Sequence, residues 1–144
     1  MTLITSNADA ALLDSGRLAL EMARRYRYSI EHLIEPDATR RLLGERSEEL
    51  EALADRLAEI IRSAGLLPRE PDLEISELRT LADQFSSWID DEACGRLLER
   101  FAEVERELLS ELETADDGSS DQRRQLLANA RERTSEFLSR LESG

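Results

Sequence analysis

The sequence predicts a single all-α domain, a four-helix bundle in which two antiparallel hairpins are joined by a long crossover. The 144 residues suit one domain, and only six Gly and three Pro interrupt them. Leu, Ala, Glu and Arg dominate the composition, and these residues favour helices over strands. Apolar side chains recur every three or four residues along four long segments, which is the spacing of one buried helix face.

The first long helix is predicted over residues 8–35. Ser6 or Asn7 can cap its start, because their side-chain oxygens accept hydrogen bonds from the free N–H groups of the first turn. Pro36 ends it, since the residue before a proline disfavours helical geometry. The predicted buried face comprises Leu12, Gly16, Ala19, Ala23, Tyr26, Ile30 and Leu33.

The second long helix is predicted over residues 37–64, where Pro36 suits the position before its first turn. Gly65 followed by Leu66 is typical of a left-handed helix stop with an apolar contact. The two helices have similar lengths and a tight connection, which favours an antiparallel hairpin. The predicted buried face comprises Thr39, Leu43, Arg46, Leu50, Leu53, Leu57, Ile60 and Ala64.

A crossover is predicted over residues 65–90. It begins as an extended linker with two prolines and continues as a short amphipathic helix over residues 73–89. The apolar stripe then turns by roughly 160° around Asp90, so one straight helix cannot bury both parts. We therefore expect a break near Asp90 and a crossover long enough to traverse the bundle.

The third and fourth long helices are predicted over residues 91–114 and 119–142. Between them, Thr114 to Gly118 forms a turn, and the Ser119-Ser-Asp-Gln122 run is typical of a capping box at a helix start. The third helix is expected to bury Cys94, Leu98, Phe101, Glu105, Leu108 and Leu112. The fourth is expected to bury Leu127, Ala130, Thr134, Phe137 and Leu141.

Several stretches between about residues 12 and 115 resemble a group of small, uncharacterised bacterial ferritin-like proteins. The most distinctive is Ala64-Gly-Leu-Leu-Pro-Arg-Glu-Pro-Asp72 in the linker. The helical stretches are Tyr26-x-x-x-Ile30, Asp37-Ala-Thr-Arg-Arg-Leu-Leu, Glu45-Arg46 and Leu97-Leu-Glu-x-x-x-Glu-x-Glu105. The resemblance implies the ferritin-like fold, in which the second and third long helices run parallel, and it implies no particular reaction.

Ferritin-like di-iron sites need inward-facing carboxylates on four helices and a Glu-x-x-His pair on two of them. The chain has one histidine, His32, which projects roughly 150° from the buried face of its helix. Glu21, at mid-height on the same helix, projects roughly 170° away. The remaining candidate acids also project outward, namely Glu45, Glu48, Glu51, Glu132 and Glu136. We therefore predict no di-metal site and no cofactor.

Two charged residues, Arg46 and Glu105, do fall on predicted buried faces. In parallel helices they would lie about five residues apart in height, roughly 7–8 Å, which an arginine side chain can cover. Tyr26 lies level with Arg46 and can add its hydroxyl. Our hypothesis is a structural polar pair at the centre of the bundle, because an unpaired buried charge costs several kcal/mol. The alternative is that these side chains reach solvent at the bundle edge.

The net charge is −13, and every basic residue apart from the histidine is arginine. An acidic surface repels phosphate backbones and anionic lipids, so we expect neither nucleic acid nor a membrane as partner. No signal peptide or apolar run of about 20 residues is visible, which favours the cytoplasm. Cys94 is expected to be an inert core residue. A second apolar stripe (Leu13, Leu20, Ile34) either receives the crossover or forms a homodimer face.

Three functions are compatible with these patterns. The favoured one is a non-enzymatic structural or protein-interaction role for a bundle without an intact di-metal site. The second is a ferritin-like metal- or oxidant-handling enzyme, which would need more inward carboxylates and histidines than the sequence offers. The third is an export or assembly chaperone that binds a partner helix in a groove. The protein partner itself cannot be named from the sequence.

Overall fold

The structure is a computed structural model that describes residues 6–32, 37–70, 91–118 and 120–143. All regular structure in this part of the chain is helical. The helices are α1 (Asn7–His32), α2 (Asp37–Ser63), α4 (Asp91–Thr114) and α5 (Asp121–Ser143). The predicted short helix over 73–89 and the break at Asp90 lie outside the described residues.

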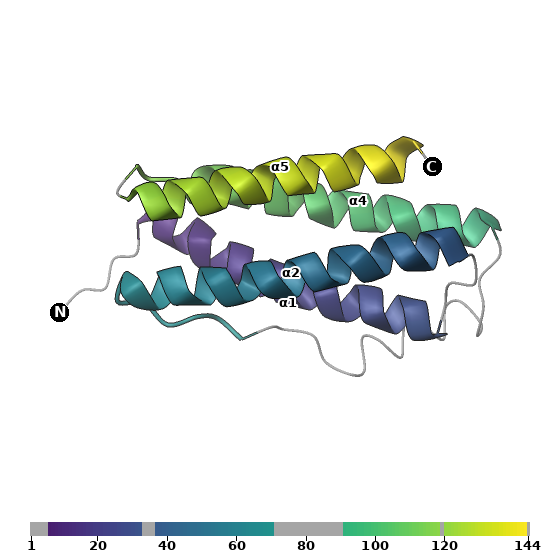
Figure 1. Ribbon diagram of the computed structural model, residues 1–144, viewed down its shortest axis with the longest axis horizontal. Coiled ribbons are helices and arrows are strands. Elements are labelled where there is room, and N and C mark those ends of the chain that lie inside the picture. Colours follow the sequence, from purple (N-terminus) through teal and green to yellow (C-terminus); the bar gives the residue numbers. More distant parts are fainter. Residues whose placement is uncertain (1–5, 33–36, 71–90, 119, 144) are drawn as a thin grey trace.

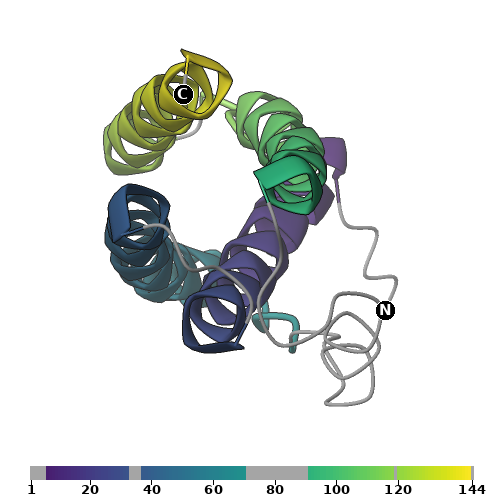
Figure 2. The same ribbon diagram turned by 90° about the vertical axis from the view of Figure 1, so that its right-hand side faces the viewer.

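The four helices form a bundle of two antiparallel pairs (Figure 1). Helices α1 and α2 run in opposite directions, as do α4 and α5, whereas α2 and α4 run in the same direction. Seen end-on, α1 packs beside α2 and α4, and α5 packs beside α4 and α2 (Figure 2). Parallel helices therefore face each other across the centre, so all four helices can direct a side chain to the same place.

The apolar seams of the helices meet along the bundle axis. The largest fully buried apolar side chains are Leu12, Met22, Leu43, Leu50, Leu57, Ile61, Leu97, Leu108 and Leu112. Ile61 and Leu97 take fully buried places where the spacing predicted Ile60 and Leu98, which are half-buried. The buried position therefore shifts by one residue at each of these two points, while the predicted seam residues that flank Leu98, namely Cys94 and Phe101, are buried.

Serine caps begin α1 and α5. The Ser6 Oγ accepts a hydrogen bond from the Asp9 N–H at 3.1 Å, as the sequence predicted for this helix start. At α5 the Ser120 Oγ accepts from the Arg123 N–H at 3.1 Å, so the cap lies one residue later than predicted. These hydrogen bonds satisfy backbone donors that the first turn of a helix leaves free.

The end of α2 has the predicted left-handed stop. Gly65 has a φ of +81°, a left-handed backbone conformation that is energetically unfavourable for residues with a Cβ atom. Its N–H donates to the Arg62 carbonyl at 3.0 Å, and the Leu66 N–H donates to the Ile61 carbonyl at 3.0 Å. This pair of hydrogen bonds is the Schellman motif, and it turns the chain sharply after α2.

One prediction about α1 was wrong: Glu21 is buried, with 6% of its surface exposed. The Arg17 Nη1 donates to both of its carboxylate oxygens, at 3.0 and 3.2 Å. Leu13, from the second apolar stripe, is also buried within the single chain. A projection from the main seam shows which face meets the bundle but not what covers the opposite face.

None of the described helices is long and apolar enough to span a membrane.

Candidate functional site

The centre of the bundle holds an ion pair between Arg46 of α2 and Glu105 of α4. The Arg46 Nε donates to Glu105 Oε2 at 3.0 Å, and its Nη2 donates to Oε1 at 2.7 Å. The two side chains are 2% and 0% exposed, so water does not screen them. This bidentate geometry matches the planar guanidinium to the planar carboxylate and is among the stronger polar contacts in proteins.

Tyr26 of α1 completes the coordination of the carboxylate. Its hydroxyl donates to Glu105 Oε2 at 2.7 Å, and its ring is fully buried. The ring packs edge-on against Phe101 at a centroid distance of 4.7 Å. Burial raises the pKa of Tyr26 well above its usual value, and the negative charge of Glu105 raises it further. The phenol therefore stays protonated and keeps donating.

The third nitrogen atom of Arg46 also has a partner, and a fourth hydrogen bond reaches α5. Its Nη1 donates to Glu49 Oε1 at 2.9 Å, and its Nη2 also donates to Thr134 Oγ1 of α5 at 2.9 Å. The guanidinium carbon lies 5.3 Å from the centre of the Phe137 ring. Burial by itself lowers the pKa of Arg46, but the hydrogen bonds and charge of Glu105 outweigh it, so this pKa lies above its usual value.

The network therefore takes one polar side chain from each described helix: Tyr26, Arg46, Glu105 and Thr134. Sliding α2 or α4 along the bundle would break three of these bonds, and sliding α1 or α5 would break one. Each break is costly, because it leaves a buried polar group without a partner. The arrangement fixes the relative height of the four helices. The sequence analysis placed Thr134 on the buried face but did not predict its contact with Arg46. The similar height of the two residues in the bundle could have indicated this contact.

The donor set at this centre suits a guanidinium and not a metal ion. Glu105, the one buried acid in it, already balances the charge of Arg46. A dication placed there would meet the positive guanidinium at close range. Elsewhere in the described residues, no group of three or more His, Cys, Asp or Glu side chains could hold a metal ion. His32, Glu45, Glu48, Glu132 and Glu136 are exposed, and Glu51 is half-buried.

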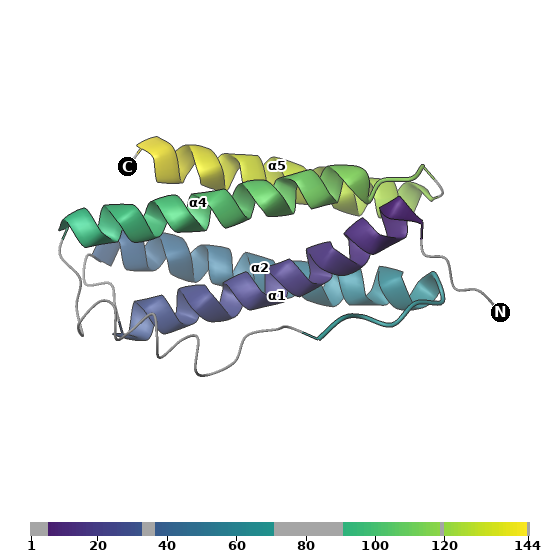
Figure 3. The same ribbon diagram turned by 180° about the vertical axis from the view of Figure 1, so that it is seen from behind.

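A second buried arginine, Arg123, was missed by the sequence analysis. Its Nε donates to the Ala115 carbonyl at 3.0 Å, and its Nη1 donates to Asp9 Oδ1 at 3.1 Å and lies 3.4 Å from Asp117 Oδ2. Arg123 thus connects the start of α5, the end of α4 and the start of α1. The start of α1 lies near the turn between α4 and α5 (Figure 3). No seam pattern reveals it, because its burial depends on how the α4–α5 turn folds back.

No known protein family and no curated protein matches this sequence. The fold is similar to the crystal structure of a conserved hypothetical protein, Rv2844, from Mycobacterium tuberculosis. The match covers 94% of this chain and 96% of that one, with a TM-score of 0.70 and 14% sequence identity. At this identity the similarity shows the fold alone, and the neighbour's description carries no activity.

Proposed function

We propose that this chain is a ferritin-like bundle whose central polar network takes the place of a di-metal centre, and that it acts as a non-enzymatic protein-interaction protein. The observation that carries the proposal is that Tyr26, Arg46, Glu105 and Thr134 meet at the bundle centre, one from each described helix. Ferritin-like metal sites also draw inward side chains from four helices.

The antiparallel pairs and the parallel α2 and α4 support the ferritin-like assignment, since that fold has one long crossover between two hairpins. An arginine in place of a metal supplies the positive charge that the buried carboxylate needs, without redox chemistry or an open coordination position. The role that follows for the network is positioning: it holds the helices in register and leaves recognition to the surface.

The surface suits binding to a basic partner. A net charge of −13 produces a field that attracts cationic surfaces and repels nucleic acid. We expect the protein to act in the cytoplasm, as a monomer or a homodimer. Sedimentation velocity at two salt concentrations distinguishes these states, because self-association of so acidic a chain should strengthen as salt screens the repulsion.

An iron oxidation assay tests the non-enzymatic assignment. Fe(II) is added to the aerobic protein, and Fe(III) formation is followed by absorbance beside the variants Glu105→Gln and Glu103→Gln. Glu103 is an exposed acid on the same helix and serves as the matched control. We expect the three proteins to give the same rate as buffer. Oxidation accelerated by the wild type and slowed only by Glu105→Gln would overturn the proposal.

A further inference from the structure

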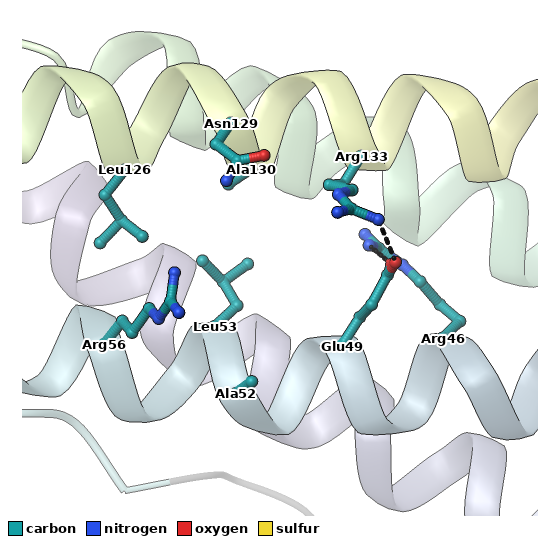
Figure 4. Close-up of a pocket in the computed structure, with 9 residues that line it drawn as sticks. All are labelled: Arg46, Glu49, Ala52, Leu53, Arg56, Leu126, Asn129, Ala130 and Arg133. Atoms are coloured by element: carbon teal, nitrogen blue, oxygen red, sulfur yellow. Dashed lines mark hydrogen bonds and ion pairs between the residues drawn. The ribbon is translucent and has the colours of Figure 1, made fainter.

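A cavity of about 190 Å³ lies between α2 and α5 beside the central network, and Arg46 of that network forms part of its lining (Figure 4). Its apolar wall is formed by Leu53 of α2 and by Leu126 and Ala130 of α5. A closed apolar cavity of about 150 Å³ is sufficient to hold a benzene molecule. The space therefore fits one ring or a short branched chain.

The charge of this cavity is opposite to that of the protein. Three arginines and one glutamate line it, and Arg46 is already balanced by Glu105. Glu49 lies between Arg46 and Arg133, 3.4 Å from the Arg133 Nη1. Arg56 makes no hydrogen bond or ion pair with any residue that the structure describes. Among the described residues, one positive charge of the cavity thus has no counter-ion, in a protein whose net charge is −13.

The unpaired guanidinium is directed into the cavity. Arg56 rises from α2 next to Leu53, and Arg133 descends from α5 on the other side of the space (Figure 4). Arg56, Asn129 and Arg133 are exposed at the rim, so a ligand can reach them from solvent. We propose that this cavity binds a small monocarboxylate, with its carboxylate on Arg56 and its apolar body against Leu53, Leu126 and Ala130.

The surrounding charges favour one carboxylate over two. Glu49 lines one end of the cavity. An adjoining space of about 340 Å³ shares Arg56, Leu126 and Asn129 with it and is also lined by Glu59. A second carboxylate on the ligand would meet one of these acids, whereas Gln122 and Gln125 in the adjoining space can bind a neutral polar extension.

An NMR titration of ¹⁵N-labelled protein with sodium benzoate tests the proposal. We expect saturable shifts at Leu53, Arg56, Asn129 and Arg133, with a Kd on the order of 1 mM for so small a ligand. Benzamide, which has the same shape without the charge, should bind at least tenfold more weakly, as should terephthalate, which carries a second carboxylate. The benzoate shifts should also weaken as salt is added.

Arg56→Gln should weaken benzoate binding by roughly tenfold, because it removes a charge-assisted hydrogen bond. The matched control is Arg100→Gln, which removes an exposed arginine of α4 that lines neither the cavity nor the adjoining space and should leave the Kd unchanged. Both arginines are exposed, so circular dichroism should show both variants folded. Absence of saturable shifts, equal affinity for benzamide, or equal weakening by the two variants would each overturn the proposal.

Discussion

Replacing Arg46 by methionine should strongly destabilise the protein, although it keeps an apolar helix seam. Methionine fills about the same space as the aliphatic part of the arginine side chain. It leaves the Glu105 carboxylate, which is 0% exposed, without its cation. Of three hydrogen bonds to that carboxylate, only the one from Tyr26 remains. Breaking a buried pair in this way costs about 3–5 kcal/mol. That is a large fraction of the roughly 5–15 kcal/mol by which domains are stable.

The reverse change should cost less. In Glu105→Leu the arginine keeps its 2.9 Å contacts with Glu49 and Thr134, so its charge is not left unpaired. The double variant Arg46→Met/Glu105→Leu removes both charges together and should lie within about 2 kcal/mol of the wild type, because well-packed apolar residues can replace a buried pair. With about 3–5 kcal/mol lost in Arg46→Met and at most about 2 kcal/mol in the double variant, the double-mutant cycle should give a coupling of at least roughly 1–3 kcal/mol, to which the cost of Glu105→Leu adds.

Urea unfolding followed by circular dichroism measures all four free energies of unfolding. The control cycle is Arg27→Met with Glu51→Leu, a pair at 2.7 Å whose side chains are 53% and 38% exposed. An exposed pair contributes about 0–1 kcal/mol, so its coupling should be small. If the coupling of Arg46 with Glu105 does not exceed that of the surface pair, the buried network does not hold the bundle as we describe.

Three further predictions concern the network and the helix ends. Because the folded pKa of Tyr26 is raised above its ordinary value of about 10, only the unfolded state loses the tyrosine proton between pH 10 and 11.5. Over this range, urea titrations should show wild-type stability falling by about 1 kcal/mol per pH unit more than that of Tyr26→Phe. Arg123→Met should lose about 2–3 kcal/mol, because it leaves the buried Ala115 carbonyl without its donor, whereas Arg124→Met, an exposed control, should change the free energy of unfolding little. Gly65→Ala should lower the free energy of unfolding by about 1 kcal/mol, because Gly65 has a left-handed φ. Gly95→Ala, which has open space around it inside α4, should raise it by about 0.5–1 kcal/mol in the same assay. The opposite order would contradict the description of the α2 stop.

The seam pattern was sufficient to find the residues at the bundle centre. Arg46 and Glu105 break an otherwise apolar spacing, and a charge at such a position must find a partner or reach solvent. Predicting the offset between these two residues along the bundle required only the helix rise per residue and the parallel direction of α2 and α4. Helix periodicity is a local property, so it is readable from a single sequence.

The features that sequence reasoning missed depend on contacts between segments far apart in the chain. Arg123 is buried because the α4–α5 turn brings Ala115 and the start of α1 around it, and no local pattern encodes that meeting. Glu21 was misplaced because a helical wheel has no information about what lies over the face opposite the seam. The cavity beside Arg56 likewise depends on how α2 and α5 pack against each other, and the sequence of neither helix indicates this packing.

Elemental analysis of the purified protein tests most directly whether the Arg46–Glu105 pair takes the place of a metal centre. The protein would be produced in medium supplemented with iron and manganese, purified without chelator and dialysed before measurement. We predict iron and manganese far below one ion per chain, and the same values for Glu105→Gln. Stoichiometric iron or manganese in the wild type that is lost in Glu105→Gln would contradict the assignment of the bundle centre.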